Sequence, residues 1–266
     1  MSLIYNATFD SQTRVLSLLD KAGNVISSCE VPSKELVDDI TKPLMFKATQ
    51  DGSTVTLSKF GSPYGSFQTS RDGGNTWEDY SLGTAITLNT GDEVSFRAKA
   101  NRTSAQSTNN FFGFQMTGKI EAWHNVMSLY RTNDFATYES VVRCAFYNMF
   151  WGYTSLTKAP ALPATRLADS CYLSMFHGCQ SLTKAPVLPA TTLADHCYEY
   201  MFKGCQSLKE VRISATKTAK GALDDWLFNV SSTGDFYCKP NATIFPTGKS
   251  GIPANWTRHN IADYPN

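Results

Sequence analysis

The sequence predicts an α+β fold, in which an N-terminal antiparallel β-sandwich is followed by a short repeat solenoid with a C-terminal cap. Residues 155–180 and 181–206 are two copies of one 26-residue unit, identical at 20 positions. A fixed period of this length is typical of a solenoid. Residues 44–125 contain short alternating apolar runs, separated by turn residues about every 8–12 residues, as in an antiparallel sandwich.

Changes in these patterns divide the chain into five predicted segments. Residues 1–33 contain three strand-like runs, and we expect them to form a β segment that anchors the protein. Residues 34–43 are charged and bounded by prolines, which indicates a linker. The remaining predicted segments are the β-sandwich at 44–125, the repeats at 126–232 and the cap at 233–266.

The composition excludes several classes of protein. Hydrophobic residues make up 42% of the 266 residues, which is enough for a packed core. The formal net charge of +1 gives no electrostatic signature of nucleic-acid or anionic-membrane binding. No apolar run is long enough to span a bilayer. The first ten residues, MSLIYNATFD, lack the basic and apolar regions of a secretory signal, so none is expected.

Residues 70–77, SRDGGNTW, match the pattern S-x-D-x-G-x-x-W and resemble the Asp box found on hairpin turns of sialidases. In that motif the Ser and Asp side chains bond turn amides while the Trp packs beneath them. Ser70, Asp72, Gly74 and Trp77 are therefore predicted to form a structural turn. A sialidase would carry several copies and an arginine triad, whereas this chain has one copy and no clustered arginines.

Each repeat is predicted to contain an extended segment and a short helix. The prolines of SLTKAP forbid a helix there, whereas LADxCYxxMFxGC has the capping residues of a short helix. Five residues of this second segment recur unchanged in the next copy: Cys171, Tyr172, Met175, Phe176 and Cys179. Because their spacing lies on one helical face, we expect these side chains to be buried.

The positions that differ between the copies are predicted to lie on the opposite, outward face. Several of these positions, and their counterparts in the outer repeats, carry aromatic or basic side chains. The candidate ligand-binding residues are Tyr147, Trp151, His177, Tyr200, Lys203 and Trp226. Aromatic residues are enriched at recognition surfaces, so this strip is a candidate contact for a glycan or a protein. Two alternatives are that the rings cover gaps beside the sandwich or tail, and that the polar loop 101–110 is the binding region.

The seven cysteines do not suggest a disulfide framework or a metal site. Cys171 and Cys179 would lie roughly 12 Å apart on a helix, too far for a disulfide. His177 lies near a cysteine but on the predicted outward face, which argues against zinc. The sequence also lacks the common nucleotide-binding, metalloprotease and serine-hydrolase motifs. We therefore expect no catalytic residues, no metal and no cofactor.

Residues 171–193 resemble the BspA-like leucine-rich repeats of surface proteins from gut anaerobes, whose signature is close to C-Y-x-x-M-F-x-G-C-x-S-L-T-x-A-P-x-L-P-A-T-x-L. The outer repeats depart from this signature, with Ala145 and Leu223 where cysteines are expected. The resemblance implies a leucine-rich-repeat solenoid and a role in adhesion or protein binding without catalysis.

These observations favour a non-enzymatic attachment protein on a virion, such as a phage fibre component, or on a cell envelope. Its expected partner is a protein or glycan on a cell surface, and the N-terminal segment is expected to mediate assembly into a homo-oligomer or a larger particle. Neither nucleic acid nor membrane insertion is expected. Two alternatives remain: a glycan hydrolase or carbohydrate-binding module, suggested by the Asp box, and a cytosolic scaffold that binds proteins through its repeats.

Overall fold

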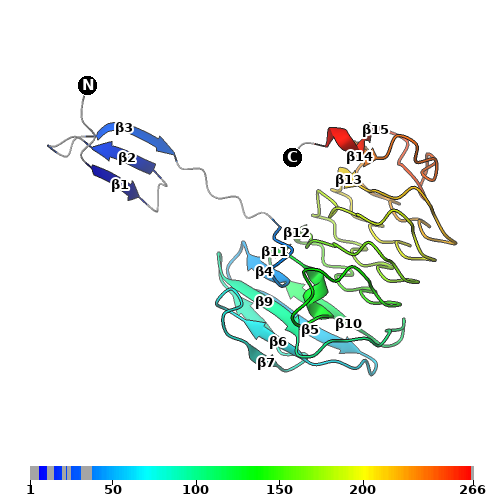
Figure 1. The fold of residues 1–266 in the computed structure, drawn as a ribbon, viewed down its shortest axis with the longest axis horizontal. Helices are drawn as coiled ribbons and strands as arrows, with labels where there is room; N and C mark the ends of the chain where they lie inside the picture. Colours follow the sequence, from blue (N-terminus) through cyan, green and yellow to red (C-terminus); the bar gives the residue numbers. More distant parts are fainter. Residues whose placement is uncertain (1–5, 11–14, 20–21, 23–24, 31–37, 265–266) are drawn as a thin grey trace. The chain divides into compact units, whose positions relative to one another are not determined.

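The computed structural model describes residues 6–10, 15–19, 22, 25–30 and 38–264 (Figure 1). The chain divides into two compact units, residues 1–37 and residues 38–266. The first unit contains a three-stranded antiparallel sheet in the order β1 (Asn6–Asp10), β2 (Val15–Leu19) and β3 (Val25–Glu30). The three strands predicted in this segment are confirmed. The sequence Lys21-Ala22-Gly23-Asn24 predicts a tight turn between the last two of these strands, and this turn lies outside the described residues, except for Ala22.

The second unit begins with two sheets that pack face to face. A six-stranded sheet has the order β12-β11-β4-β9-β6-β7, and a three-stranded sheet has the order β10-β5-β8. The strands are β4 (Met45–Ala48), β5 (Ser53–Phe60), β6 (Phe67–Ser70), β7 (Glu78–Tyr80), β8 (Ile86–Leu88), β9 (Glu93–Ala98), β10 (Phe111–Thr117), β11 (Ile120–Trp123) and β12 (Leu156–Lys158). The predicted sandwich-like, strand-rich character of this region is confirmed.

Alternation of side chains explains how these strands form a core. Along β5, Val55 and Leu57 are buried, whereas the neighbouring Thr54 and Thr56 are partly exposed. Rings from the two sheets meet in the middle, with Phe46 lying 4.6 Å from Phe114 between ring centroids. Because successive strand residues point to opposite faces, this apolar alternation places one face of each sheet inside.

The predicted α+β class is wrong, and the helix-containing leucine-rich-repeat solenoid is not found. The described residues contain no α-helix, only two short 3-10 helices, η1 (Val126–Leu129) and η2 (Ile261–Asp263). The segment 167–179, where a short helix was expected, instead forms a series of turns over residues 169–178. No helix of the described residues is long and apolar enough to cross a membrane.

The hydrogen bonding of the turns explains why no helix forms. The N–H of Tyr172 donates to the carbonyl of Cys197 in the next repeat (3.0 Å), whereas the N–H of Leu173 donates to Ser170, three residues earlier (3.2 Å). This alternation continues from residue 170 to residue 179. A helix would need every amide for bonds within its own segment. Here every second amide is used between repeats instead.

The backbone angles follow the same four-residue rhythm. Ser170 and Ser174 have φ angles of 55° and 54°, and Gly178 has 77°. A left-handed residue at every fourth position ends each turn before a helix can propagate. The burial of the recurring residues Cys171, Tyr172, Met175, Phe176 and Cys179 is confirmed. Their offsets of 0, 1, 4, 5 and 8 fit a four-residue period as well as a helical one. The prediction that these side chains are buried is therefore correct, although the segment that carries them is a series of turns and not a helix.

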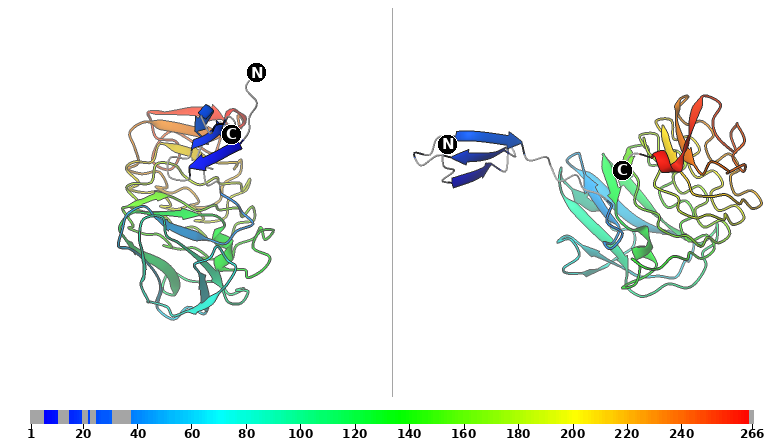
Figure 2. Two further views of the ribbon diagram at one scale, coloured as in Figure 1. Left: turned by 90° about the vertical axis from the view of Figure 1, so that its left-hand side faces the viewer. Right: turned by 45° about the horizontal axis from the view of Figure 1, so that its top comes forward.

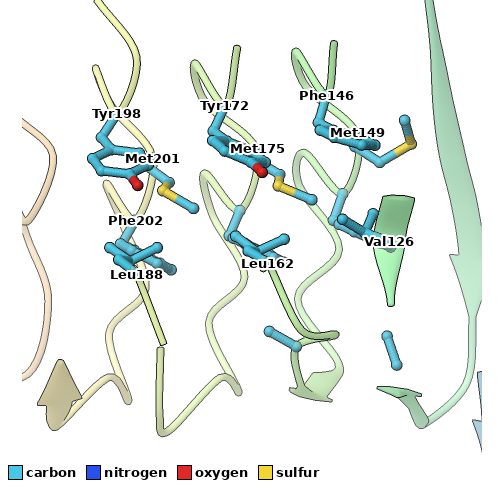
Figure 3. Close-up of a cluster of buried hydrophobic side chains, with 14 of the residues drawn as sticks. Val126, Phe146, Met149, Leu162, Tyr172, Met175, Leu188, Tyr198, Met201 and Phe202 are labelled. Atoms are coloured by element: carbon cyan, nitrogen blue, oxygen red, sulfur yellow. The ribbon is translucent and has the colours of Figure 1, made fainter. Parts of the chain in front are cut away.

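The repeats thus form a stack of coils, in which equivalent residues lie beside one another (Figures 1 and 2). Figure 3 shows Phe146, Tyr172 and Tyr198 as one such row, with Met149, Met175 and Met201 as the next. The rings of Phe150 and Phe176 lie 5.3 Å apart and almost parallel, and those of Phe176 and Phe202 lie 5.6 Å apart.

The column of rings begins in the sandwich. Phe114 of β10 stacks on Phe150 of the first coil at 5.6 Å, with an interplanar angle of 10°. At the other end, Trp226 contacts Phe202 at 6.4 Å and Phe236 at 6.0 Å. Phe236 belongs to a parallel three-stranded sheet of β13 (Glu210–Arg212), β14 (Gly234–Cys238) and β15 (Trp256–Asn260). Sandwich, coils and C-terminal region therefore share one core.

The final part of the predicted linker also belongs to this unit. The N–H of His124 donates to Asp38 Oδ1 (2.9 Å), and the N–H of Asp39 donates to His124 Nδ1 (3.1 Å).

The six cysteines whose side chains are described are all buried and unpaired; Cys29 is outside the described side chains. Cys179 donates to the carbonyl of Phe150 in the preceding coil (3.2 Å). These thiols are therefore part of the packing between coils.

The left-handed position at Gly178 yields a stability prediction. The same place in the last coil is occupied by Asn229, also left-handed, with a φ of 59°. Gly178→Ala is expected to lower the free energy of unfolding by about 1–2 kcal/mol, because a Cβ is strained in this conformation. Gly178→Asn is expected to cost less, since Asn tolerates that region better. Urea denaturation measures both, and an Asn variant less stable than the Ala variant would contradict this account.

Candidate ligand-binding site

A pocket of about 410 Å³ lies where the sandwich meets the first coil. Phe60 and Phe111 line one side as a directly opposed pair on β5 and β10, with ring centroids 4.7 Å apart and nearly parallel. Trp151 of the first coil contributes a further ring. The other lining residues are Gly113, Phe114, Gln115, Met116, Asn148, Gly152 and Tyr153. The pocket is thus largely aromatic, as small-molecule sites commonly are.

The edge of β10 positions the first coil beside these rings. The N–H of Phe114 donates to the carbonyl of Met149 (2.8 Å), so the coil continues the hydrogen bonding of the sheet. Gly113 makes this approach feasible, since a Cβ there would lie 3.3 Å from the Phe60 ring and 3.4 Å from the Asn148 carbonyl. Trp151 follows two residues after Met149 and reaches the pocket from this fixed backbone.

The orientation of Trp151 is set by the next coil. Its indole Nε1 donates to His177 Nδ1 (3.2 Å), and the two rings meet edge to face at 6.2 Å. Burial and the nearby Lys203 lower the pKa of His177, so the imidazole is neutral at pH 7 and able to accept this bond. Trp151 nevertheless keeps 59% of its surface exposed.

The polar groups of the pocket are uncharged. Gln115 Oε1 accepts a bond from Ser58 Oγ (3.0 Å), which leaves its amide nitrogen without a partner in the described chain. The side chain of Asn148 likewise makes no hydrogen bond to the described residues. No Asp, Glu, Lys or Arg occurs among the residues that line the pocket. The site therefore offers aromatic faces and two amides, and no fixed charge.

Five of the six predicted ligand-binding residues, all except Trp226, have exposed or partly exposed side chains. Trp151, His177 and Lys203 occupy equivalent positions in three successive coils, and Tyr147 packs edge-on against Phe111 at 4.9 Å, beside the pocket. Lys203 Nζ lies 4.6 Å from the ring centre of Tyr200 and 5.3 Å from that of Phe228. Only Trp151 of the predicted residues lines the pocket itself.

The prediction that Trp226 lies on the outward face is wrong. Trp226 is fully buried, and its Nε1 donates to the carbonyl of Gly251 (3.0 Å). The last coil is one residue shorter than the others: Gly178 bonds the carbonyl 25 residues later, whereas Gly204 bonds Phe228, 24 residues later. Phe228, with 46% of its surface exposed, takes the outward place. Gly152, Gly178 and Gly204 are spaced 26 residues apart, and Asn229 follows Gly204 after 25. Aligning Asn229 with these glycines would have revealed the shift from the sequence.

The pocket residues on the sandwich, Phe60, Phe111 and Gln115, were also missed by sequence reasoning. No motif marks them, because they are ordinary strand residues until β10 meets the first coil. The recurring unit directed attention to the coils alone. They line the pocket because the N–H of Phe114 on β10 bonds the carbonyl of Met149 and brings the first coil beside them.

The Asp-box residues form the turn between β6 and β7, away from the pocket lining. Ser70 Oγ accepts from the N–H of Gly74 (2.8 Å), and Asp72 Oδ1 accepts from the N–H of Thr76 (2.9 Å). Trp77 donates to the carbonyl of Gly74 (2.9 Å) and lies beneath Arg97, 4.1 Å from its guanidinium carbon. Hydrogen bonds from Thr76, and then from Ser70, hold the pKa of Asp72 well below its usual range. Its carboxylate is occupied within the turn.

Comparisons with known protein families, curated proteins and solved structures find no significant match. Within the part of the chain that the structure describes, no group of three or more His, Cys, Asp and Glu residues is placed to hold a metal ion.

The Asp72 carboxylate gives a pH-dependent prediction. Asp72→Asn is expected to lower the melting temperature at pH 7, because the charged carboxylate accepts the bonds of the turn more strongly. A depressed folded-state pKa stabilises the fold above the unfolded-state pKa of about 3.9. The difference between the two proteins should therefore shrink as the pH falls below about 4. Thermal unfolding at several pH values tests this, and a difference independent of pH would contradict it.

His177 gives a second prediction. Since Lys203 contributes to its low pKa, Lys203→Met is expected to raise that pKa, as measured by NMR titration of the imidazole. The unfolded chain binds this proton more tightly than the folded chain, so His177 reduces stability as the pH falls below about 6.5. Protonation also removes the acceptor for Trp151, and the indole N–H resonance should shift in parallel. An unchanged pKa in the variant would show that the two side chains are not coupled.

Proposed function

We propose that this chain is a non-enzymatic recognition protein that binds its ligand in the aromatic pocket between the sandwich and the first coil. The observation that carries this proposal is the exposure of Trp151, at 59%, beside the stacked Phe60 and Phe111 in a pocket without charged residues. Exposed aromatic surface is unfavourable in water and is concentrated at contact sites.

The chemistry of the pocket favours a glycan as the ligand. Aromatic rings pack well against the apolar C–H faces of sugars, and the free amides of Asn148 and Gln115 are able to bond hydroxyl groups. A charged peptide would find no opposite charge in the lining. Beyond the pocket, the positions equivalent to Trp151 in the next three coils are occupied by His177, Lys203 and Phe228.

Two observations support binding without catalysis. Hydrolysis of a glycosidic bond commonly requires a pair of carboxylates across the bond, and the pocket lining contains no carboxylate. The hydrolase alternative began from the Asp box, where Asp72 is engaged in bonds to its own turn. The carbohydrate-binding alternative agrees with the pocket chemistry and is included in this proposal.

We also propose display on a virion or cell surface, with attachment and oligomerisation through the N-terminal unit. The support for this part comes from the sequence resemblance of residues 171–193 to bacterial surface proteins. The separation of residues 1–37 from residues 38–266 as a compact unit fits an attachment segment joined to a recognition segment.

The pocket is tested by replacing Trp151. Trp151→Ser is expected to abolish binding of the full chain on a glycan array, with the free energy of unfolding unchanged within about 0.5 kcal/mol, as for most surface substitutions. Phe228→Ser is the matched control, because it removes an exposed ring from the equivalent position in the last coil. This control is expected to retain binding.

Three outcomes distinguish the competing interpretations. Loss of binding in the Trp151 variant alone supports the pocket. Loss in both variants would extend the ligand surface over the whole outward row. Normal binding by the Trp151 variant, combined with a melting temperature several degrees lower, would show that the ring is packing and would overturn the proposal.

A further inference from the structure

We infer that Arg102 and Tyr64 form a second binding site, specific for an anionic oxygen group such as a carboxylate, a sulfate or a phosphate. The site lies in residues 99–110, between β9 and β10, and in residues 61–66, between β5 and β6. It does not depend on the proposed aromatic pocket, because no residue lines both.

Arg102 is held firmly in place by its backbone and by one nitrogen. Its N–H donates to the carbonyl of Tyr130 (2.7 Å), and Nη1 donates to the carbonyl of Leu129 (3.0 Å). The guanidinium carbon lies 4.4 Å from the ring centre of Tyr130 and 4.7 Å from that of Phe112. Aromatic faces stabilise a cation, and here they also fix the plane of the guanidinium group.

No carboxylate of the described residues neutralises the charge of Arg102. Within the described residues, Arg102 forms no salt bridge, Nε is buried without an acceptor, and Nη2 has no acceptor. Arg131 and Arg143, by contrast, pair with Asp134 and Asp169. A largely buried cation without a counter-charge is unfavourable, and a bound anion would supply that charge.

Two adjoining pockets, of about 170 and 210 Å³, give access to this cation. Both are lined by Arg102, Tyr64 and Ser104, and neither contains an acidic residue. Either volume exceeds that of several water molecules, at roughly 30 Å³ each in the liquid. An anion there would meet positive charge and hydroxyl groups without like-charge repulsion.

The geometry assigns a role to each side chain. The Nη2 group of Arg102, which has no acceptor in the described chain and is not among its buried atoms, would form charge-assisted bonds to the anion, which are stronger than bonds between neutral groups. The hydroxyls of Thr103 and Ser104 make no bond to the described chain and line the same space. Tyr64, 87% exposed, stands at both pockets, where its ring would contact the organic part of a ligand.

The competing explanation is that Arg102 serves only to fasten the loop to Tyr130 and Phe112. Such a purely structural residue would stabilise the fold and would show no saturable response to anions. A binding role and a purely structural role for Arg102 are therefore distinguished by whether the protein responds saturably to added anions.

The test is an NMR titration of the full chain with sodium sulfate, sodium phosphate and sodium acetate, each at constant ionic strength balanced by sodium chloride. The amides of Thr103 and Ser104 and the Arg102 Nε–H resonance are expected to shift and saturate with at least one of the three, while the Trp77 indole stays unchanged. The salt that saturates identifies the source of the anionic group. Linear, equal shifts with all three salts would overturn the proposal.

Variants separate the site from nonspecific ionic effects. Arg102→Met is expected to remove the saturable shift, whereas Arg71→Met, which removes an exposed arginine that lines neither pocket, is expected to leave it present. Arg102→Lys keeps the charge but loses the planar fork, so its affinity should fall at least about tenfold. This variant decides the question if Arg102→Met does not fold. Wild-type affinity in Arg102→Lys would overturn the proposal.

Discussion

The alternating use of backbone amides is the constraint on which the second unit depends. In the turn segment of each coil, as over residues 170–179, every second amide donates to the next coil, and the intervening amides close turns within the coil. This division leaves no isolated coil with all its amides bonded, so a coil is stable only beside a neighbour. It also brings the backbones of adjacent coils to hydrogen-bonding distance, which allows aromatic rings at equivalent positions to stack, as those of Phe150 and Phe176 do at 5.3 Å.

The same hydrogen bonding places the candidate site. The edge of β10 acts as the neighbour of the first coil, with Phe114 bonded to Met149. Phe60 and Phe111 of the sheet and Trp151 of the first coil therefore line one pocket, which neither the sheet nor the coil forms alone. The polar loop containing Arg102 is fastened to the same body through Tyr130. Both candidate surfaces are therefore supported by rigid backbone on at least one side, as preorganised sites require.

Sequence reasoning succeeded where the signal was local and periodic. The alternation in β5 predicted a strand, and the recurring Cys171, Tyr172 and Phe176 predicted buried positions. It failed at the helix because periods of 3.6 and 4 residues cannot be distinguished over nine residues. The decisive feature, a left-handed Ser174, is a property of backbone bonding between coils and not of serine. Likewise, a one-residue shortening moved Trp226 inside and Phe228 outside, and Phe60 acquires significance only through a contact across the fold.

The near-identity of the two central copies has an evolutionary consequence. Residues 155–180 and 181–206 present the same hydrogen-bonding edges above and below, so an in-frame tandem duplication of these 26 codons would insert one more coil without disturbing its neighbours. The aromatic pocket and the Arg102 region lie at the sandwich end and would be unaffected. The length of this protein is therefore able to change by recombination, in steps of one coil, independently of its two candidate sites.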